Sequence, residues 1–345
     1  MENILSPLIS ADSHVIEPED LWAKGLPLNL RAGAPRYPSH PYQVHNGGAI
    51  GATRVKEMAV DDVSAEVLYP SLMLDQFSIS DPALQEACFR VYNDWLAEYC
   101  SHHPDRVFGV CTISLYRIDE ALRELERCKK TGMRGAMVWQ VPPENLSFAT
   151  RHYEKFWAAA QEMDMPVSMH ANTGIPFALG GAAKWGTDAV KRITTLINVK
   201  LMHAQNALTQ FIFSGALERF PGLKIVLVEN EVSWIPYFIT QADKFYGRAN
   251  FEDPGMRRTP SEYFSRQIFA TFFNDPPSRW LFGNWGTDNF MWSNDFPHKN
   301  STWPKSRDVL ARDLKHLSLV DRTKLTHDNV SRLYKLPKIQ HITAI

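Results

Sequence analysis

The sequence lacks several features that would place it at once in a functional class. It has no excess of charge of either sign, because 37 lysines and arginines stand against 38 aspartates and glutamates, a formal net charge of −1. This balance argues against a nucleic-acid partner and against an anionic membrane surface, since both favour a basic excess. No apolar run reaches the roughly 18 residues of a membrane-spanning helix. The segment Met1–Ser10 lacks a basic start followed by a long apolar stretch, so we expect no signal peptide.

Cysteine is scarce and forms no recognisable pattern. No CxxC pair occurs among the four cysteines, which are Cys88, Cys100, Cys111 and Cys128. In a chain of 345 residues they indicate reduced, mostly buried thiols and a cytoplasmic protein. Glycine-rich phosphate motifs of the GxGxxG or GxxxxGK[ST] kind follow none of the predicted strands, which disfavours a nucleotide-binding enzyme.

What the chain does contain is an alternation of short apolar runs with runs of helical period. The predicted strands are Leu8–Ser13, Glu66–Ser71, Phe108–Ser114, Gly135–Trp139, Pro166–His170, Lys224–Glu229, Ile268–Phe273 and Asn289–Asn294. The predicted helices are Pro82–Cys100, Ile118–Lys130, Arg151–Met163, Leu208–Phe220, Trp234–Tyr246 and Trp303–His316. Near-continuous apolar strands suit a parallel sheet covered on both faces. Eight such units favour an α/β fold of the (β/α)8 TIM-barrel kind, with residues 1–345 as a single domain.

Two stretches rich in glycine and proline interrupt this alternation. Gly25–Val55 follows the first predicted strand and Thr173–Asn198 follows the fifth. We therefore expect loop insertions after strands 1 and 5, both at the carboxyl-terminal face of the barrel. Long loops at that face usually contribute to active sites, although ordinary surface insertions would read the same way in the sequence.

Ionisable residues stand at the carboxyl ends of four predicted strands, where barrel closure would gather them. They are Asp12 and His14 after strand 1, His170 after strand 5, Glu229 after strand 6, and Asp295 with His298 after strand 8. No lysine or arginine stands at these ends, so a divalent metal ion is the simplest way to neutralise the carboxylates. Two plainer readings stay open: Asp12 as the N-cap of a following helix, and His170 as a hydrogen-bonded core histidine.

Other polar and aromatic residues near the strand ends are candidates for supporting roles. Glu231 replaces Glu229 as the strand-6 residue if the register is shifted by two, because side chains on one face of a strand repeat every two residues. Trp139 and Gln140 end the fourth strand and are candidate substrate-binding residues. His203 is a candidate for substrate contact or catalysis, with metal binding or a helix start as alternatives.

Several segments, taken in order, resemble one enzyme family. They are Ala11–Pro18, Pro166–His170, Phe213–Lys224, Met291–His298 and His327–Tyr334. In these segments the chain resembles the amidohydrolase superfamily, and more narrowly the amidohydrolase-related branch that contains aminocarboxymuconate-semialdehyde decarboxylase and the resorcylate-type decarboxylases. The resemblance covers nearly the whole chain and implies a barrel, a bound metal and a dimer.

The resemblance also implies roles for individual residues. The metal-binding pair of the first strand falls on Asp12 and His14, the histidine of the fifth strand on His170, and the aspartate of the eighth strand on Asp295. The decarboxylases typically carry an acid/base histidine after the sixth strand, and this sequence has Glu229 there instead. The departure puts the decarboxylase mechanism in doubt, because a carboxylate can bind metal where an imidazole would transfer protons.

The donor set is richer in carboxylates than a single zinc site requires. Such mixed oxygen and nitrogen ligands suit iron or manganese as well as zinc. Two arrangements stay open: two ions with a bridging carboxylate, or one ion with Glu229 as a nearby base. In either case the expected cofactor is one or two divalent transition-metal ions.

We expect foremost a metal-dependent hydrolase of a small organic acid derivative, in which the resemblance implies Asp295 as general base. The alternatives are a non-oxidative decarboxylase of an aromatic or unsaturated carboxylate, with Asp295 or Glu229 as proton donor, and an iron-dependent oxygen-activating enzyme with a dinuclear site. A barrel kept as an inactive subunit is a non-enzymatic alternative, which the intact ligand set disfavours. The expected partner is a small-molecule substrate, and the expected assembly is a homodimer or a hetero-oligomer with a related chain.

Overall fold

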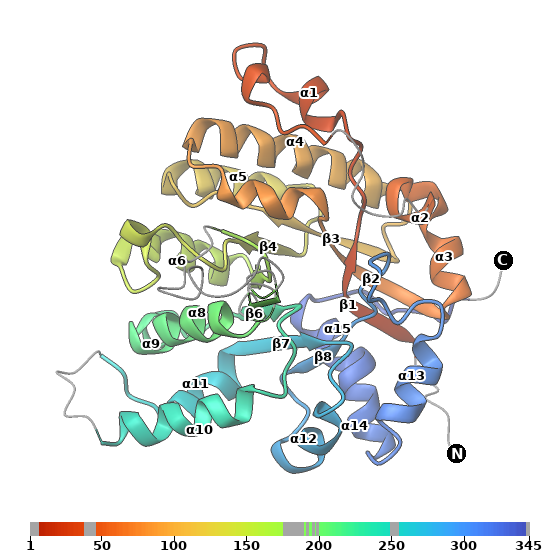
Figure 1. The fold of residues 1–345 in the computed structure, drawn as a ribbon, viewed down its shortest axis with the longest axis vertical. Helices are drawn as coiled ribbons and strands as arrows, with labels where there is room; N and C mark the ends of the chain where they lie inside the picture. Colours follow the sequence, from red (N-terminus) through yellow and green to blue (C-terminus); the bar gives the residue numbers. More distant parts are fainter. Residues whose placement is uncertain are drawn as a thin grey trace.

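The computed structural model describes residues 7–37, 46–174, 190, 193–194, 197, 200–248 and 255–342. Eight strands run in the order β1 to β8 in one sheet, and every neighbouring pair is parallel. The strands are β1 (Leu8–His14), β2 (Val63–Tyr69), β3 (Val107–Thr112), β4 (Gly135–Val138), β5 (Val167–His170), β6 (Ile225–Val228), β7 (Ile268–Phe272) and β8 (Phe290–Trp292). All their residues are buried, and helices surround them (Figure 1).

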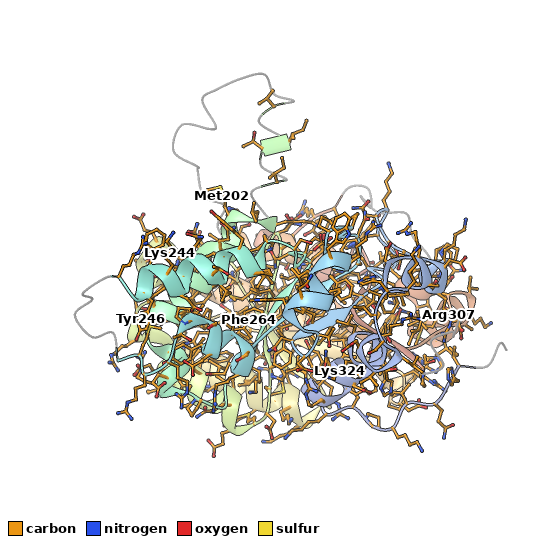
Figure 2. The ribbon with its side chains drawn as sticks, turned by 90° about the horizontal axis from the view of Figure 1, so that it is seen from below. Met202, Lys244, Tyr246, Phe264, Arg307 and Lys324 are labelled. Atoms are coloured by element: carbon orange, nitrogen blue, oxygen red, sulfur yellow. The ribbon has the colours of Figure 1, made fainter. Side chains whose placement is uncertain are left out.

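Helices follow most strands and cover the outside of the sheet. The longer ones are α4 (Pro82–Ser101), α5 (Ile118–Lys130), α6 (Glu154–Glu162), α8 (Met202–Phe213), α10 (Ile235–Tyr246), α11 (Pro260–Gln267), α12 (Ser278–Trp285) and α13 (Ser306–Asp313). The shorter ones are α1 (Leu21–Gly25), α2 (Asn46–Ala49), α3 (Arg54–Val60), α9 (Ala216–Arg219), α14 (Leu319–Thr323) and α15 (Asn329–Leu333). Between the last two lies the π-helical turn η7 (Lys324–Asp328). In the view from below in Figure 2, Met202 is labelled in the upper part of the ribbon and Lys324 in its lower part.

The barrel closes between its last strand and its first. The Asp295 N–H donates to the Asp12 carbonyl (3.1 Å), and the His14 N–H donates to the Phe296 carbonyl (2.6 Å). A register shift between Ser10 and Ser13 marks a bulge in β1. Bulges re-aim side chains at barrel rims. This one lies in the strand that carries Asp12 and His14.

The predicted (β/α)8 barrel is confirmed. The boundaries of its elements differ from the predicted ones at the start of strand 2 and in the helix before strand 6. Predicted strand 2 begins three residues late, since β2 already starts at Val63 with the polar residues Ser64 and Glu66 buried. The predicted helix Leu208–Phe220 is wrong in its boundaries, because α8 starts at Met202 and Gly215 breaks it. Gly215 takes the left-handed conformation with φ 70°, which glycine adopts without a steric penalty.

The two predicted insertions are described only in part. Within Gly25–Val55 the structure contains short helical turns, including η1 (Arg31–Gly33) and α2, while residues 38–45 lie outside the described residues. Most of Thr173–Asn198 also lies outside them. Among the described residues, none of the helices is both long enough and apolar enough to cross a membrane. The cytoplasmic location and the oligomeric state stay predictions.

Candidate metal centre

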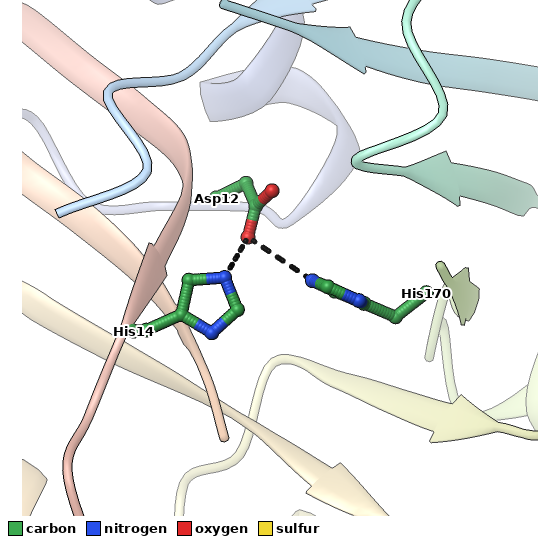
Figure 3. Close-up of side chains that lie close together, drawn as sticks. All are labelled: Asp12, His14 and His170. Atoms are coloured by element: carbon green, nitrogen blue, oxygen red, sulfur yellow. Dashed lines mark ion pairs between the residues drawn. The ribbon is translucent and has the colours of Figure 1, made fainter. Parts of the chain in front are cut away.

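Asp12 and His14 lie two residues apart in β1, so their side chains project from the same face of the strand. Both are fully buried. Figure 3 shows the Asp12 carboxylate between two imidazoles, with Oδ1 3.4 Å from His14 Nε2 and 3.7 Å from Nε2 of His170 at the end of β5. Asp12 lies within a strand, which rules out the alternative that it caps a helix.

The two histidines present the same nitrogen to the centre of the barrel. His14 Nδ1 donates to the Pro70 carbonyl (2.7 Å), and His170 Nδ1 donates to the Ala171 carbonyl (2.7 Å). Because a carbonyl oxygen can only accept, each Nδ1 carries a proton, and in the neutral ring the lone pair is therefore on Nε2. Hydrogen bonds of this kind fix the tautomer and ring orientation of metal-binding histidines.

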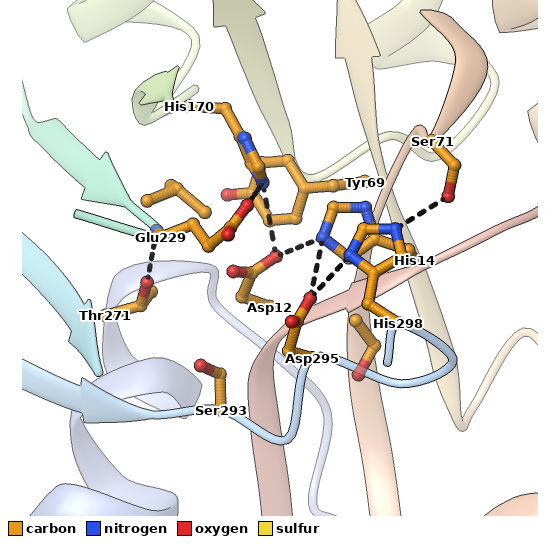
Figure 4. Close-up of polar contacts among 12 residues, drawn as sticks. Asp12, His14, Tyr69, Ser71, His170, Glu229, Thr271, Ser293, Asp295 and His298 are labelled. Carbon is orange, nitrogen blue, oxygen red and sulfur yellow. Dashed lines mark hydrogen bonds and ion pairs between the residues drawn. The ribbon is translucent and has the colours of Figure 1, made fainter. Parts of the chain in front are cut away.

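Asp295 joins the cluster from the loop after β8. Its Oδ1 lies 3.3 Å from His14 Nε2 and 2.9 Å from His298 Nδ1, and Figure 4 shows the carboxylate beneath both rings. The backbone of Asp295 has a positive φ of 56°. Such a conformation is strained for a non-glycine residue and is found often at functional sites.

The arrangement has the properties of a metal site. Two groups of donors each fall within 4.8 Å of one another: Asp12 with His14 and His170, and His14 with Asp295 and His298. Donors bound to one ion at roughly 2.0–2.2 Å lie about 3.0–3.8 Å apart for angles near 90–120°. The distances of 3.3, 3.4 and 3.7 Å between carboxylate oxygen and imidazole nitrogen fit this range.

Unpaired polar atoms at the same place support this interpretation. Both Asp12 oxygens and the Nε2 atoms of His14 and His170 are buried and have no hydrogen-bond partner among the described residues. A buried carboxylate whose oxygens accept no hydrogen bond is costly, and a divalent cation removes that cost. The donor set of carboxylates and imidazoles therefore fits a divalent transition metal.

The two histidines titrate differently in the metal-free protein. Burial, followed by the charge of His298, lowers the pKa of His14 well below its usual range. Burial also acts to lower the pKa of His170, but the neighbouring Asp12 and Glu229 carboxylates outweigh it and raise that pKa to about 9. A metal ion therefore competes with a proton mainly at His170.

His298 extends the cluster towards β2. Its ring stacks on that of His14, with centroids 3.9 Å apart, and its Nε2 lies 3.1 Å from the Ser71 hydroxyl (Figure 4). Both ring nitrogens therefore have protein neighbours, Asp295 on one side and Ser71 on the other. The predicted metal-binding role of His298 stays a prediction, and its contacts also suit a residue that positions Asp295.

Glu229 lies at the edge of the cluster. Its Oε2 is 3.7 Å from His170 Nε2, but it belongs to neither of the two donor groups found in the described part of the chain. Its Oε1 lies 2.9 Å from the ammonium of Lys200. A lysine from the segment before α8 thus supplies a positive charge to Glu229, and the predicted metal-binding role of Glu229 stays a prediction.

The turn after β6 holds both candidate glutamates in strained conformations. Glu229 and Glu231 have φ values of 58° and 55°. The Glu229 N–H donates to the Thr271 hydroxyl (3.0 Å), and Asn230 accepts from the Gln140 side-chain amide (2.8 Å). Burial raises the pKa of Glu231 to about 7, with Lys200 opposing the shift. Glu229 points towards His170, 3.7 Å from its Nε2 (Figure 4), and the choice between Glu229 and Glu231 as the functional strand-6 residue stays a prediction.

The candidate substrate-binding residues occupy different places. Gln140 links the ends of β4 and β6 through Asn230, and Trp139 packs edge-on against Tyr116 with centroids 4.9 Å apart. Gln140 Oε1 and Trp139 Nε1 are buried without a hydrogen-bond partner among the described residues. A polar ligand could form hydrogen bonds with both atoms, which is consistent with the predicted substrate-binding role of these residues. That role stays a prediction. His203 is buried in the first turn of α8 and belongs to neither donor group in the described part of the chain.

A buried ion pair beside the cluster does not emerge from the sequence patterns. Arg54 Nε lies 2.5 Å from Glu66 Oε2, and its Nη1 donates to the His14 carbonyl (2.7 Å). The Ser13 hydroxyl donates to the other Glu66 oxygen (3.2 Å). Arg54 thereby joins α3, β1 and β2 behind the metal-binding strand. The sequence does not indicate this ion pair, because Arg54 lies in the stretch Gly25–Val55, which is rich in glycine and proline and is predicted as a loop insertion.

Comparison with known proteins decides the family. The model of the amidohydrolase family matches residues 46–336. The chain belongs to this family. The predicted resemblance is thus confirmed, and so is the prediction that the protein is an enzyme of the amidohydrolase superfamily.

Individual relatives of this chain are decarboxylases. The chain is 24% identical over 291 residues to the gamma-resorcylate decarboxylase of Polaromonas sp. (strain JS666 / ATCC BAA-500), covering 75% of this chain and 79% of that protein. A crystal structure of 2,6-dihydroxybenzoate decarboxylase complexed with 2,6-dihydroxybenzoate has a TM-score of 0.75 at 20% identity, covering 96% of this chain and 100% of the other. The 5-carboxyvanillate decarboxylase of Novosphingobium aromaticivorans DSM 12444, complexed with manganese and 4-hydroxy-3-methoxy-5-nitrobenzoic acid, has a TM-score of 0.76 at 17% identity, covering 96% and 97%. At these identities the structural likeness establishes the fold.

Proposed function

We propose that this enzyme is a metal-dependent decarboxylase, which removes the carboxylate group of an aromatic acid as CO2 without oxidation. The observation that carries the proposal is the group of buried, unpaired donors formed by Asp12, His14 and His170, with Asp295 beside it. The relative and the two solved structures described above are decarboxylases of aromatic acids, which supports the second of the reactions expected from the sequence over hydrolysis.

The site suits one ion better than two. The two donor groups share His14, whose Nδ1 is engaged by the Pro70 carbonyl. Its Nε2 has a single lone pair and can bind a single ion, so both groups merge into one site with Asp12, His14, His170 and Asp295 as ligands. Manganese is the first candidate, because carboxylate-rich mixed sites suit it and a solved structure of similar fold contains it.

A bound divalent ion would supply a Lewis acid that holds oxygen substituents of the substrate. The residues of the chain then have to deliver one proton to the ring carbon that carries the carboxylate. The new C–H bond takes that proton, the electron pair of the broken C–C bond returns to the ring, and CO2 leaves. Asp295 is the proposed proton donor, since its carboxylate lies beside His14 and His298 at the centre of the site.

Glu229 is the second candidate for the proton donor. It takes the place of the histidine that decarboxylases of this branch typically carry, and its Oε2 faces His170. Its Oε1 is already engaged in the ion pair with Lys200, which suits an electrostatic role. Asp295 is therefore placed first, with Glu229 in support.

The experiment that tests this function is a direct product assay. The manganese-loaded protein is incubated with 2,6-dihydroxybenzoate and 5-carboxyvanillate, and CO2 and the decarboxylated arene are measured together. We expect equal amounts of both products from at least one aromatic acid, and none from Asp295→Asn. Asp105→Asn, which removes a carboxylate that is 75% exposed, is the matched control and should retain the wild-type rate. Release of an alcohol or amine from esters or amides without CO2 would favour hydrolysis instead.

A further inference from the structure

A lysine reaches the edge of the metal centre from the long segment between β5 and α8. Lys200 lies two residues before Met202, the first residue of α8. Its ammonium is 2.9 Å from Glu229 Oε1 and lies over the ring of Phe273, 5.1 Å from the centroid. Lys200 therefore brings a positive charge to Glu229 at the edge of the donor cluster.

Glu229 connects this lysine directly to the metal donors. One carboxylate oxygen contacts Lys200, while the other lies 3.7 Å from His170 Nε2. The distance from the ammonium to the cluster is therefore bridged by a single carboxylate group. A ligand held at the metal by one end can reach Lys200 with a substituent at its other end.

The charges around Lys200 leave it able to take another partner. The acids whose charges act on it are Glu229, Glu231 and Asp295, and among the described residues its ion pair is with Glu229. An ammonium has three N–H donors, and the Lys200 side chain is one-third exposed whereas that of Glu229 is 13% exposed. A ligand can thus accept a hydrogen bond from Lys200 while the ion pair with Glu229 persists.

We propose that Lys200 is a specificity-determining residue, which binds an anionic group of the substrate through its ammonium while Glu229 and Phe273 hold it in place. The proposal rests on the proposed function, because it names aromatic acids as the substrate class. Phe273 gives the flat apolar surface against which an aromatic ring and the lysine stem can both pack. Neutral aromatic compounds of the same shape lack the group that Lys200 recognises.

The test compares two ligands of nearly the same shape, one with a carboxylate and the other with an uncharged amide in its place. The probes are 4-hydroxy-3-methoxy-5-nitrobenzoic acid and its primary amide, and their affinities for the manganese-loaded protein are measured by titration calorimetry. We expect the wild type to prefer the acid on the order of 10- to 100-fold, the scale of one charge-assisted hydrogen bond. Lys200→Met should remove most of this preference and leave the affinity for the amide unchanged, and Lys200→Arg should keep the preference.

A matched variant controls for the loss of a lysine as such. Lys324 is 34% exposed and pairs with Asp288 at 2.7 Å, much as Lys200 pairs with Glu229. Asp288 precedes β8, at the end of that strand opposite to Asp295. Lys324→Met should therefore keep the full preference for the acid.

Each other result would overturn the proposal. A preference for the acid that survives Lys200→Met would assign the recognition elsewhere. An equal loss of both ligands in that variant would make Lys200 a clamp for Glu229 rather than a contact of the substrate. A wild type that binds neither probe, or binds both equally, would contradict recognition of an anionic group.

The outcome is separable from that of the proposed function. Binding of the probes requires no turnover, whereas decarboxylation is measured by CO2. A protein that discriminates acid from amide through Lys200 but releases no CO2 would retain this inference and lose the proposed reaction. A protein that releases CO2 with an unchanged preference in Lys200→Met would do the reverse.

Discussion

Two buried carboxylates on neighbouring strands have opposite surroundings. Glu66 in β2 is 1% exposed, and it pairs with Arg54 and accepts a hydrogen bond from Ser13. Asp12 in β1 is fully buried as well, yet neither of its oxygens has a hydrogen-bond partner among the described residues. The protein thus supplies hydrogen-bond partners to the carboxylate of Glu66 and leaves the oxygens of Asp12 available to a metal ion.

The difference indicates which carboxylate serves the fold and which serves the chemistry. A buried charge requires a partner, and Glu66 has one of its own in Arg54. Around Asp12 stand the Nε2 atoms of His14 and His170, which can bind a metal ion together with Asp12 once His170 has lost its proton. The following predictions separate the two cases, beginning with the largest expected effect.

Removing one imidazole from the cluster of Asp12, His14 and His170 should abolish activity. His170→Ala deletes a nitrogen donor at the end of β5 and should reduce the metal content to near zero and the decarboxylation rate to background. The barrel should remain folded, because function lies at the carboxyl-terminal face and stability largely elsewhere. Metal analysis, circular dichroism and the CO2 assay check the three points. An insoluble or unfolded variant would instead indicate a structural histidine.

Removing Arg54 from its buried ion pair with Glu66 should destabilise the fold. Arg54→Met leaves Glu66 buried and unpaired, so we expect a loss of about 3–5 kcal/mol in the free energy of unfolding, measured by urea denaturation. Arg123→Met removes an exposed partner of Glu120 and should cost less than about 1 kcal/mol. The double variant Arg54→Met/Glu66→Met should recover much of the loss. Equal stability of Arg54→Met and Arg123→Met would refute the comparison.

Glu229 lies between the two cases, because it has a lysine partner and also faces His170. Glu229→Gln keeps the shape and removes the charge, so we expect unchanged metal content and a rate reduced roughly 100-fold. Glu231→Gln serves as the comparison and should have a smaller effect, since its pKa of about 7 already leaves it partly neutral. A lower metal count in Glu229→Gln would make Glu229 a ligand. A slower Glu231→Gln with a normal Glu229→Gln would exchange their roles.

Metal affinity should depend on pH through His170. Its pKa of about 9 in the metal-free protein means that at neutral pH a proton occupies His170, which the ion must displace. The apparent affinity for Mn²⁺ should therefore rise up to about tenfold per pH unit between pH 7 and 9 and level off above that. Titrations at four pH values measure the slope. A flat profile over this range would show that His170 does not bind the ion.

The sequence predicts the barrel and the main donors because both follow local rules. Near-continuous apolar runs such as Ile225–Val228 identify buried parallel strands, and barrel closure places their ends together. Asp12, His170 and Asp295 could be named on that ground alone. The positive φ of Asp295, which turns its side chain at the strand end, could not be seen.

Other features depend on contacts between distant segments and carry no local signal. Lys200 belongs to a segment whose path the sequence does not specify, so its contact with Glu229 could not be predicted. The pair of Arg54 and Glu66 was missed for the same reason, because Arg54 lies in a stretch that reads as an insertion. The cluster of Asp12, His14 and His170 follows from the order of the strands. The partners of Glu66 and Glu229 depend instead on how distant segments pack together.

The central claim is that Asp12, His14, His170 and Asp295 bind one divalent ion. The most direct measurement is the number of metal ions per chain in protein stripped with a chelator and reloaded with Mn²⁺. The account predicts one ion in the wild type and in Glu229→Gln, and close to none in Asp12→Asn. Two ions in the wild type, or an unchanged count in Asp12→Asn, would contradict it.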